Sequence, residues 1–215
     1  MRDMFSTIAP RYDFITRAFS FGMDRRWKRL AVKQAGLPPA PRILDLACGT
    51  ADFGKLALEF SPGAQIVAAD ITHSMLQLAQ IRDAVCADAA LLPFRPASFD
   101  AVFVGYGLRN FPQLDLALQE IQRVLNPGGM VVTLDFFLPP NAFWRSIYLA
   151  YLYAQGAFWG ILLHGRARIY TYIPDSLANF LSADGFASRL QTQFSNITVR
   201  PFLLGGIAVH WARKL

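Results

Sequence analysis

The segment that most constrains the fold is residues 42–54, RILDLACGTADFG, where three local patterns follow one another. Residues 43–46 form a short apolar run typical of a buried strand, residues 47–51 form a turn of small residues, and a helix is expected from Asp52. Strand, tight turn and helix in this order are how a doubly wound α/β sheet presents backbone N–H groups to a ligand. We therefore predict a ligand site at the carboxyl end of this strand.

The acid inside this strand bears on which ligand binds. A carboxylate repels a pyrophosphate but attracts a sulfonium, so Asp45 favours S-adenosylmethionine over a dinucleotide. The dinucleotide fingerprint G-x-G-x-x-G is not present, because only Gly49 and Gly54 are glycines in this turn. A second apolar run, 66–70, ends in Asp70, 21 residues after Gly49, where a carboxylate binds ribose hydroxyls in both kinds of site. The sequence therefore predicts S-adenosylmethionine as the cofactor, with Asp45, Gly49 and Asp70 at its site.

Strands and helices alternate from Pro41 onward. We expect strands near 42–46, 65–70, 84–87, 99–104 and 130–136, helices near 52–60, from Thr72, 113–125 and 174–184, and a final hairpin of strands near 191–201 and 206–212. Strands separated by helices and followed by a hairpin suit a mostly parallel sheet with a reversed strand at one edge. The predicted fold class is α/β, on the class I methyltransferase plan: a Rossmann-like, mostly parallel, seven-stranded sheet with a C-terminal antiparallel hairpin.

The chain of 215 residues is the size of one domain with a full core. Within it we expect an N-terminal helical cap at 1–36, a cofactor-binding core at 41–136, an apolar lid at 137–172 and a C-terminal helix and hairpin at 173–215. The lid contains residues 146–163, eighteen residues without a charge, which is the lower limit for a membrane span. We interpret them as an apolar helical pair or lid over a hydrophobic substrate, with a true span and a dip into one leaflet as alternatives.

The composition bears on partners and compartment. Hydrophobic residues make up 53% of the chain, charged residues make up 17%, and the net charge is +6, so an apolar substrate and an anionic bilayer surface are favoured. No nucleic-acid partner is expected, because the chain has no extra basic module. Cys48 and Cys86 lack the spacing of metal ligands, so we expect no metal site and a reducing, cytoplasmic location. Contact with the cytosolic face of a membrane and a homodimer are both left open.

Several motifs resemble those of the ubiquinone/menaquinone-biosynthesis C-methyltransferase family. They lie at residues 4–13, 20–28, 44–52, 69–76, 88–94, 107–110, 123–129 and 208–210, and so cover nearly the whole chain. The most family-specific of them is Gly107-Leu108-Arg109-Asn110. The resemblance implies S-adenosylmethionine as the cofactor, with contacts from residues that match the family's cofactor motifs: Thr50, Asp70, Asp88 and Ala89.

Two positions depart from the family pattern. Ala51 stands where the family usually has glycine, so either this turn has a right-handed backbone or the methyl group narrows the approach of the cofactor. Gly105 stands where the family often has serine, and we include it among the predicted cofactor-binding residues although it has no hydroxyl. Met75 either lies against the adenine or packs in the core.

The reaction that the resemblance implies is methyl transfer to a ring carbon of a prenylated hydroquinone, with demethylmenaquinol as the expected acceptor. A phenol with a pKa of about 10 must lose its proton before the neighbouring carbon can attack the sulfonium methyl. We predict that Arg109 stabilises the phenolate and polarises a water that takes the proton, while Asn110 orients that water or a ring oxygen. Tyr12 is expected to close the site, and His210 is either the alternative base or a packed core residue. Transfer to oxygen or nitrogen of another lipophilic molecule, and a non-catalytic quinone- or lipid-binding subunit, are the alternative functions.

Overall fold

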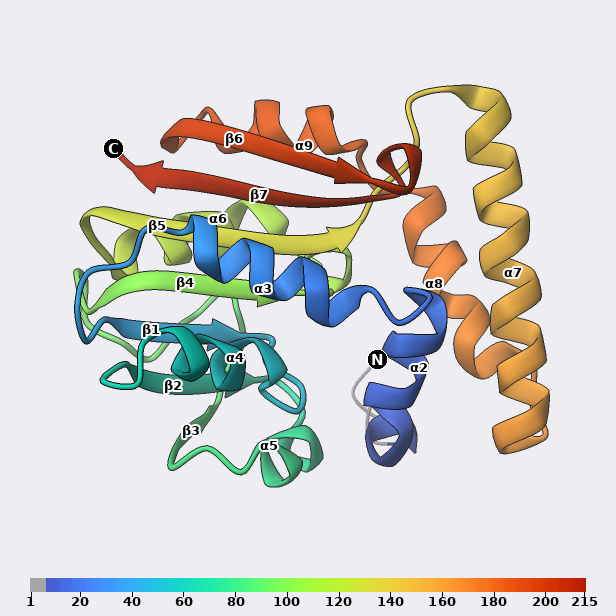
Figure 1. Ribbon diagram of the computed structural model, residues 1–215, viewed down its shortest axis with the longest axis horizontal. Coiled ribbons are helices and arrows are strands. Elements are labelled where there is room, and N and C mark those ends of the chain that lie inside the picture. The colour runs from blue at the N-terminus through green and yellow to red at the C-terminus, as the bar shows by residue number, and fades with distance from the viewer. Residues whose placement is uncertain (1–6) are drawn as a thin grey trace.

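The computed structural model describes residues 7–215, and its centre is one seven-stranded sheet in the order β3-β2-β1-β4-β5-β7-β6 (Figure 1). The strands are β1 (Arg42–Leu46), β2 (Gln65–Asp70), β3 (Asp83–Cys86), β4 (Phe99–Gly105), β5 (Leu125–Phe136), β6 (Phe194–Phe202) and β7 (Ile207–Lys214). Strands β1 to β5 pair in parallel, while β7 runs antiparallel to both β5 and β6. This sheet confirms the predicted fold class and the C-terminal hairpin.

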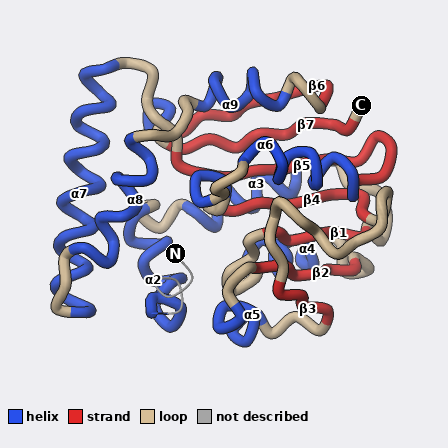
Figure 2. Tube along the Cα trace, turned by 180° about the vertical axis from the view of Figure 1, so that it is seen from behind, coloured by secondary structure: helices blue, strands red, loops and turns tan. Residues whose placement is uncertain are grey.

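Helices cover both faces of the sheet and one end of it. They are α2 (Tyr12–Phe19), α3 (Asp24–Gln34), α4 (Asp52–Phe60), α5 (His73–Ala79), α6 (Leu114–Val124), α7 (Ala142–His164), α8 (Arg168–Ala178) and α9 (Ala183–Leu190), with short 3-10 turns η1 (Ala9–Arg11), η2 (Leu108–Asn110) and η3 (Leu203–Gly205). One core layer packs α3 and α4 on the sheet, and a second packs α6 and α9 on the opposite face. Helices α2, α7 and α8 stand at the end of the sheet where β1 and β4 finish (Figures 1 and 2).

The burial of these strands explains why they could be predicted from the sequence. In β1 and β2 every residue after the first is buried, because helices cover both faces. Such strands appear in a sequence as continuous apolar runs and not as alternating ones. Asp70, which ends β2, and Asp45, one residue before the end of β1, therefore lie toward the same edge of the sheet, where the parallel strands finish together.

The helix predicted at 174–184 is wrong. Helix α8 passes through Pro174 and ends at Ala178, and α9 begins at Ala183, where the Ser182 side chain accepts a hydrogen bond from the Gly185 nitrogen at 3.1 Å. A proline inside a helix removes the hydrogen bond to the carbonyl four residues earlier, which usually ends the helix. Here the buried side chains of α8 keep the helix in place by tertiary packing.

The apolar segment forms one continuous helix, α7, of 23 residues, and its helical partner is α8. Gly156 and Gly160 make this pairing close: a Cβ atom at Gly156 would lie 2.9 Å from the Tyr170 carbonyl oxygen, and one at Gly160 would lie 2.6 Å from the Arg166 oxygen. The boundary expected at residue 172 therefore falls inside α8. Among residues 7–215, α7 alone is long and apolar enough to cross a membrane by length and composition.

The N-terminal cap is helical where it is described, in α2 and α3. Residues 1–6, which include the start of the family-like segment 4–13, lie outside the described part of the chain. The indole nitrogen of Trp211 on β7 donates to the Ala31 carbonyl at 2.9 Å, which fixes α3 on the sheet. The cap thereby holds α2 beside the carboxyl ends of β1 and β4 (Figure 1).

Candidate active site

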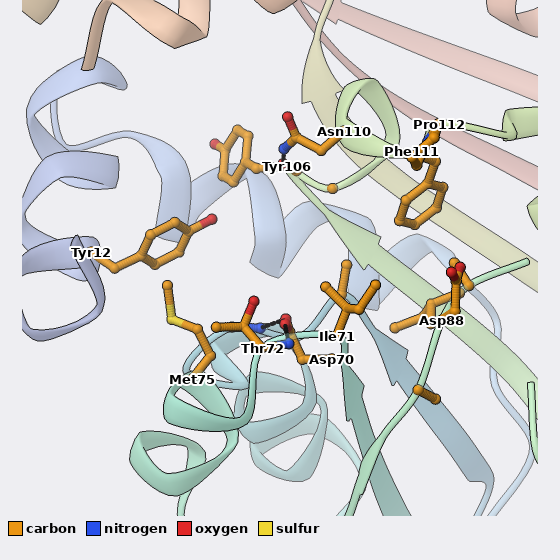
Figure 3. A pocket seen from close by; sticks show the side chains of 16 residues that line it. Tyr12, Asp70, Ile71, Thr72, Met75, Asp88, Tyr106, Asn110, Phe111 and Pro112 are labelled. Carbon is orange, nitrogen blue, oxygen red and sulfur yellow. Dashed lines mark hydrogen bonds between the residues drawn. The ribbon is translucent and has the colours of Figure 1, made fainter. Parts of the chain in front are cut away.

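A cavity of about 280 Å³ lies at the carboxyl ends of β1, β2 and β4. Strand order reverses here, because the chain passes from β1 to β2 on one side and returns to β4 on the other. Such a reversal is where open α/β sheets bind ligands. The lining residues are Tyr12, Leu46, Ala47, Gly49, Asp70, Ile71, Thr72, Met75, Ala87, Asp88, Ala89, Tyr106, Gly107, Asn110, Phe111 and Pro112 (Figure 3).

The turn after β1 is held in place by the acid that ends β2. One carboxylate oxygen of Asp70 accepts from the Gly49 nitrogen at 2.9 Å, and the other accepts from the Thr72 nitrogen at 2.8 Å. Burial raises the pKa of Asp70, and these two N–H donors oppose the rise. Asp70 thus lines the cavity, as its place at the end of an apolar run predicted, and it also shapes the loop beside it.

The backbone of the turn is left-handed at three positions, including Gly49 at φ +54° and Ala51 at φ +60°. A right-handed backbone at Ala51, one of the two expected arrangements, is therefore wrong. Ala51 is fully buried beneath the turn and does not line the cavity, so its methyl group leaves the approach to Gly49 open.

Asp88 and Ala89, which follow β3, line the cavity, and Asp88 lies at the opposite side of it from Tyr12 (Figure 3). The Asp88 carboxylate accepts from the Ala90 nitrogen at 2.9 Å, which fixes the loop. Phe111 approaches the same side from above, whereas Met75 lies beside Tyr12 (Figure 3). Met75 is buried, belongs to the core and also lines the cavity, so the expected packing in the core is met.

Three predicted cofactor residues lie behind the cavity wall, around a void of about 10 Å³ that Tyr12 and Tyr106 also line: Asp45, Thr50 and Gly105. Asp45 accepts from the Gly54 nitrogen at 2.8 Å, and burial raises its pKa to about 7. The Thr50 hydroxyl donates to Asp13 on α2 at 2.7 Å, which ties the turn to the cap. A Cβ at Gly105 would lie 3.1 Å from the Phe53 ring, so this chain has little room for a serine there.

Arg109 lies on η2, the turn after β4, and is buried against Asp135 at the end of β5. Asp135 is fully buried and also accepts from the Leu108 and Phe136 nitrogens, both at 2.8 Å. Burial raises the pKa of Asp135, and the Arg109 guanidinium opposes that rise. Burial acts to lower the pKa of Arg109, but Asp135, Tyr172 and Tyr12 together outweigh it and the pKa is raised, so Arg109 stays protonated and cannot serve as a base.

The neighbouring Asn110 lines the main cavity, and its amide nitrogen donates to the Tyr106 carbonyl at 3.4 Å. Arg109 instead lines a narrow cavity of about 20 Å³ next to the main one. Tyr12 and Tyr106 line both cavities and so form the wall between them. The structure thus brings Tyr12, Arg109 and Asn110 together around one junction.

Sequence reasoning missed two residues at this junction, Asp135 and Tyr106. Asp135 lies one residue before the end of an apolar strand, much as Asp70 ends β2, so the same signal could have found it. Tyr106 directly follows β4, but nothing in its sequence context shows that the residue is left-handed and buried.

His210 is a core residue. Its Nε2 donates to the Ala183 carbonyl at 2.9 Å, and its ring lies between Phe137 and Phe186, with centroids 4.9 and 5.0 Å away. Burial lowers its pKa to about 4. In the described part of the chain, no group of three or more His, Cys, Asp or Glu side chains could hold a metal ion.

A sheet of this order, with strand-end carboxylates and a cavity at the reversal of strand order, defines a class I S-adenosylmethionine-dependent methyltransferase. Solved structures agree on the fold. One described as a possible histamine N-methyltransferase from Thermotoga maritima has a TM-score of 0.68 at 17% identity and covers 100% of both chains. A Haemonchus contortus phospholethanolamine N-methyltransferase 2 bound to S-adenosylhomocysteine has a TM-score of 0.65 at 17% identity, over 88% of this chain and 52% of that one.

The chain belongs to the ubiE/COQ5 methyltransferase family, whose model matches residues 1–214. A demethylmenaquinone methyltransferase of Thermus thermophilus is 39% identical over 216 residues, covering 96% of this chain and 98% of the relative. A ubiquinone/menaquinone biosynthesis C-methyltransferase UbiE of a Geobacter species is 37% identical, over 97% of this chain and 93% of the relative. The expected family, enzyme class and cofactor are therefore confirmed.

Proposed function

We propose that this enzyme transfers the methyl group of S-adenosylmethionine to a ring carbon of demethylmenaquinol. The observation that carries the proposal is the junction at Tyr12, where a cavity walled by carboxylates meets a buried arginine. The relatives named for demethylmenaquinone support the same acceptor. An apolar pair, α7 and α8, stands over this end of the sheet and suits a prenyl tail (Figure 1).

The cavity suits a cofactor that carries a positive charge and ribose hydroxyls. Gly49 and Asp70 would hold its methionine and ribose parts, and Asp88 and Ala89 would hold its adenine. Asp45, Thr50 and Gly105 would support this wall from behind through their contacts to α4, α2 and Phe53. When bound, the cofactor supplies an electrophilic methyl group on a positively charged sulfur.

The protein's own part is to make the acceptor carbon nucleophilic and to exclude water. Arg109 stabilises the phenolate that forms when a water removes the phenol proton, and Asn110 orients that water or a ring oxygen. The new bond joins the ring carbon to the methyl, and the sulfur–methyl bond breaks. The ring carbon then loses its proton, and the ring oxygen takes one proton back. The products are the methylated hydroquinone, S-adenosylhomocysteine and one proton. Tyr12, on α2, closes the site beside Gly49.

The test begins with calorimetry of S-adenosylhomocysteine. Wild-type protein should bind it, and Asp70→Ala should lose much of the affinity because the Gly49 turn loses its anchor. A panel of demethylated quinols under reductant, analysed by mass spectrometry, then identifies the acceptor and the methylated atom. A new methyl on oxygen or nitrogen would replace the proposal by the alternative chemistry. Binding without turnover on any quinol would favour the non-catalytic subunit.

We propose further that the outer face of α7 lies on the cytosolic surface of an anionic membrane. Apolar side chains form an exposed stripe along the helix: Phe143, Ile147, Ala150, Ala154, Phe158 and Ile161. Phe143 is 66% exposed, Phe158 is 57% exposed and Ile161 is 60% exposed. Arg166 and Arg168, both exposed, lie just beyond the C-terminal end of the helix, where they can meet lipid phosphates.

Flotation with phosphatidylglycerol vesicles tests this placement. Phe158→Glu should reduce binding, because it puts a charge in the middle of the stripe. Ser188→Glu, exposed on α9, makes the same change of charge away from the stripe and should bind as wild type does. Wild-type protein that stays unbound while sedimenting as a dimer would contradict the proposal and assign the stripe to a second copy.

A further inference from the structure

The narrow cavity beside the main one is built from two kinds of residue. Half of its lining residues are apolar: Ile8, Ile15, Phe19, Phe136 and Ile173. The others carry polar groups: Tyr12, Thr16, Tyr106, Arg109 and Tyr172, of which Tyr172 is hydrogen-bonded to Arg109. The side chains of Tyr106 and Arg109 are buried. A volume of about 20 Å³ accommodates one water-sized group and excludes an aromatic ring. A ring in the main cavity could therefore place only a substituent here.

Tyr106 has a left-handed backbone, with φ +58°. Large side chains rarely adopt this conformation, and such residues concentrate at functional sites. Its nitrogen donates to the Leu134 carbonyl at 2.7 Å, and its own carbonyl accepts from Arg109 at 3.2 Å and Asn110 at 3.4 Å. These bonds hold the strained residue at the end of β4, with its ring at the junction of the two cavities (Figure 3).

The hydroxyl of Tyr106 is buried and has no hydrogen-bond partner among residues 7–215. Nε of Arg109, a residue that lines the same narrow cavity, is likewise buried and has no hydrogen-bond partner among residues 7–215. Buried polar groups in native proteins are nearly always paired, so two such groups on one small cavity indicate a ligand that supplies the missing acceptor.

We infer that the Tyr106 hydroxyl and the Arg109 guanidinium together bind one ring oxygen of the acceptor, which enters the narrow cavity while the ring stays in the main one. This inference rests on the proposed function and adds a substrate-binding residue to it. Tyr106 donates to the oxygen, and the bond strengthens as the phenolate forms, so its loss should lower kcat more than it raises KM.

The state of Tyr106 agrees with the role of a donor. Burial raises the pKa of its hydroxyl well above the usual value, and Asp24, Tyr12 and Asp135 add to the rise. The hydroxyl therefore keeps its proton beside a phenolate. Its ring is also held by two neighbours. The ring centroids of Tyr106 and Phe136 are 5.2 Å apart, and the Lys28 ammonium lies 5.7 Å from the Tyr106 ring centroid.

The experiment is Tyr106→Phe, assayed with the quinol that wild-type enzyme methylates. We expect kcat to fall by about 100-fold, the effect of removing one donor to an oxyanion, with the affinity for S-adenosylhomocysteine unchanged. The melting temperature of the ligand-free protein should stay the same or rise, because the hydroxyl removed has no partner there.

Tyr148→Phe is the matched control, since that buried hydroxyl donates to the Gly206 carbonyl at 2.7 Å. It should lower the melting temperature by about 2–4 °C and leave kcat within a few-fold of wild type. Wild-type kcat in Tyr106→Phe would overturn the inference and leave the proposed function standing. A wild-type enzyme that methylates no quinol would overturn both.

Discussion

The buried pair of Arg109 and Asp135 makes a prediction about stability that is separate from catalysis. Arg109 is 3% exposed and Asp135 is fully buried, so neither charge can turn to solvent when its partner is removed. Removing one member of such a pair costs about 3–5 kcal/mol, because the other remains buried and uncompensated. For a chain of this length, Arg109→Ala should therefore lower the melting temperature by about 6–20 °C at neutral pH.

The stability that Arg109→Ala loses should depend on pH in a defined direction. Burial already raises the pKa of Asp135 and Arg109 opposes the rise, so without Arg109 the pKa rises further. A carboxyl whose pKa is higher in the folded state than in the unfolded state stabilises the fold at low pH and loses that contribution as the pH rises. The variant should lose stability relative to wild type once the pH exceeds the wild-type pKa of Asp135, which already lies above the usual value of about 4, by up to about 1.4 kcal/mol per pH unit.

Thermal unfolding from pH 5 to pH 8 measures both effects. Arg189→Ala is the control, because its pair with Asp115 is exposed, at 40% and 56%, and should contribute less than about 1 kcal/mol. Asp135→Asn added to Arg109→Ala should recover part of the loss by removing the buried charge. An Arg109→Ala protein that melts as wild type does, or whose loss is the same at every pH, would refute this reasoning.

Three further predictions concern other parts of the fold. Gly206→Ala should destabilise the protein by about 1–3 kcal/mol in urea unfolding, since its Cβ would lie 2.6 Å from the Tyr148 ring. His210→Phe should make stability less sensitive to acid. The pKa of His210 is about 4 in the folded protein and about 6.5 in the unfolded chain, so wild type loses up to about 3 kcal/mol of stability as the pH falls from about 6.5 to about 4. Ala51→Gly should change stability by less than about 1 kcal/mol. Glycine removes the strain of a left-handed φ, which stabilises the fold, but it also removes a buried methyl group, which destabilises it by a similar amount.

The sheet was predictable because its signals are local. Strands buried on both faces appear as apolar runs, and the acids that end them, Asp70 among them, mark the edge where the cavity lies. The helix at 174–184 failed for a reason that is not local. Pro174 cannot hydrogen-bond the Tyr170 carbonyl, and that oxygen instead lies against Gly156 of α7. Only the paired helix makes a proline acceptable there.

The candidate site was predicted in part. Asp88, Ala89 and Asn110 line the main cavity, whereas Arg109 lies behind its wall beside Asp135. Arg109 lies beside Asp135 because β4 and β5 are neighbours in the sheet, which brings together residues 26 positions apart in the sequence. The left-handed backbone of Tyr106 likewise depends on its bond to the Leu134 carbonyl on β5, so no pattern within its own strand indicates it.

The glycine contact between α7 and α8 has a mechanical consequence. At Gly156 and Gly160 the two backbones meet with no side chain between them, so neither helix can slide along the other without driving carbonyl groups into carbon atoms. The pair should therefore behave as one rigid unit, which the buried side chains of Tyr148, Tyr170 and Ile173 anchor in the core. A long isoprenoid chain would have to lie along the outside of this unit, because no space opens between its two helices.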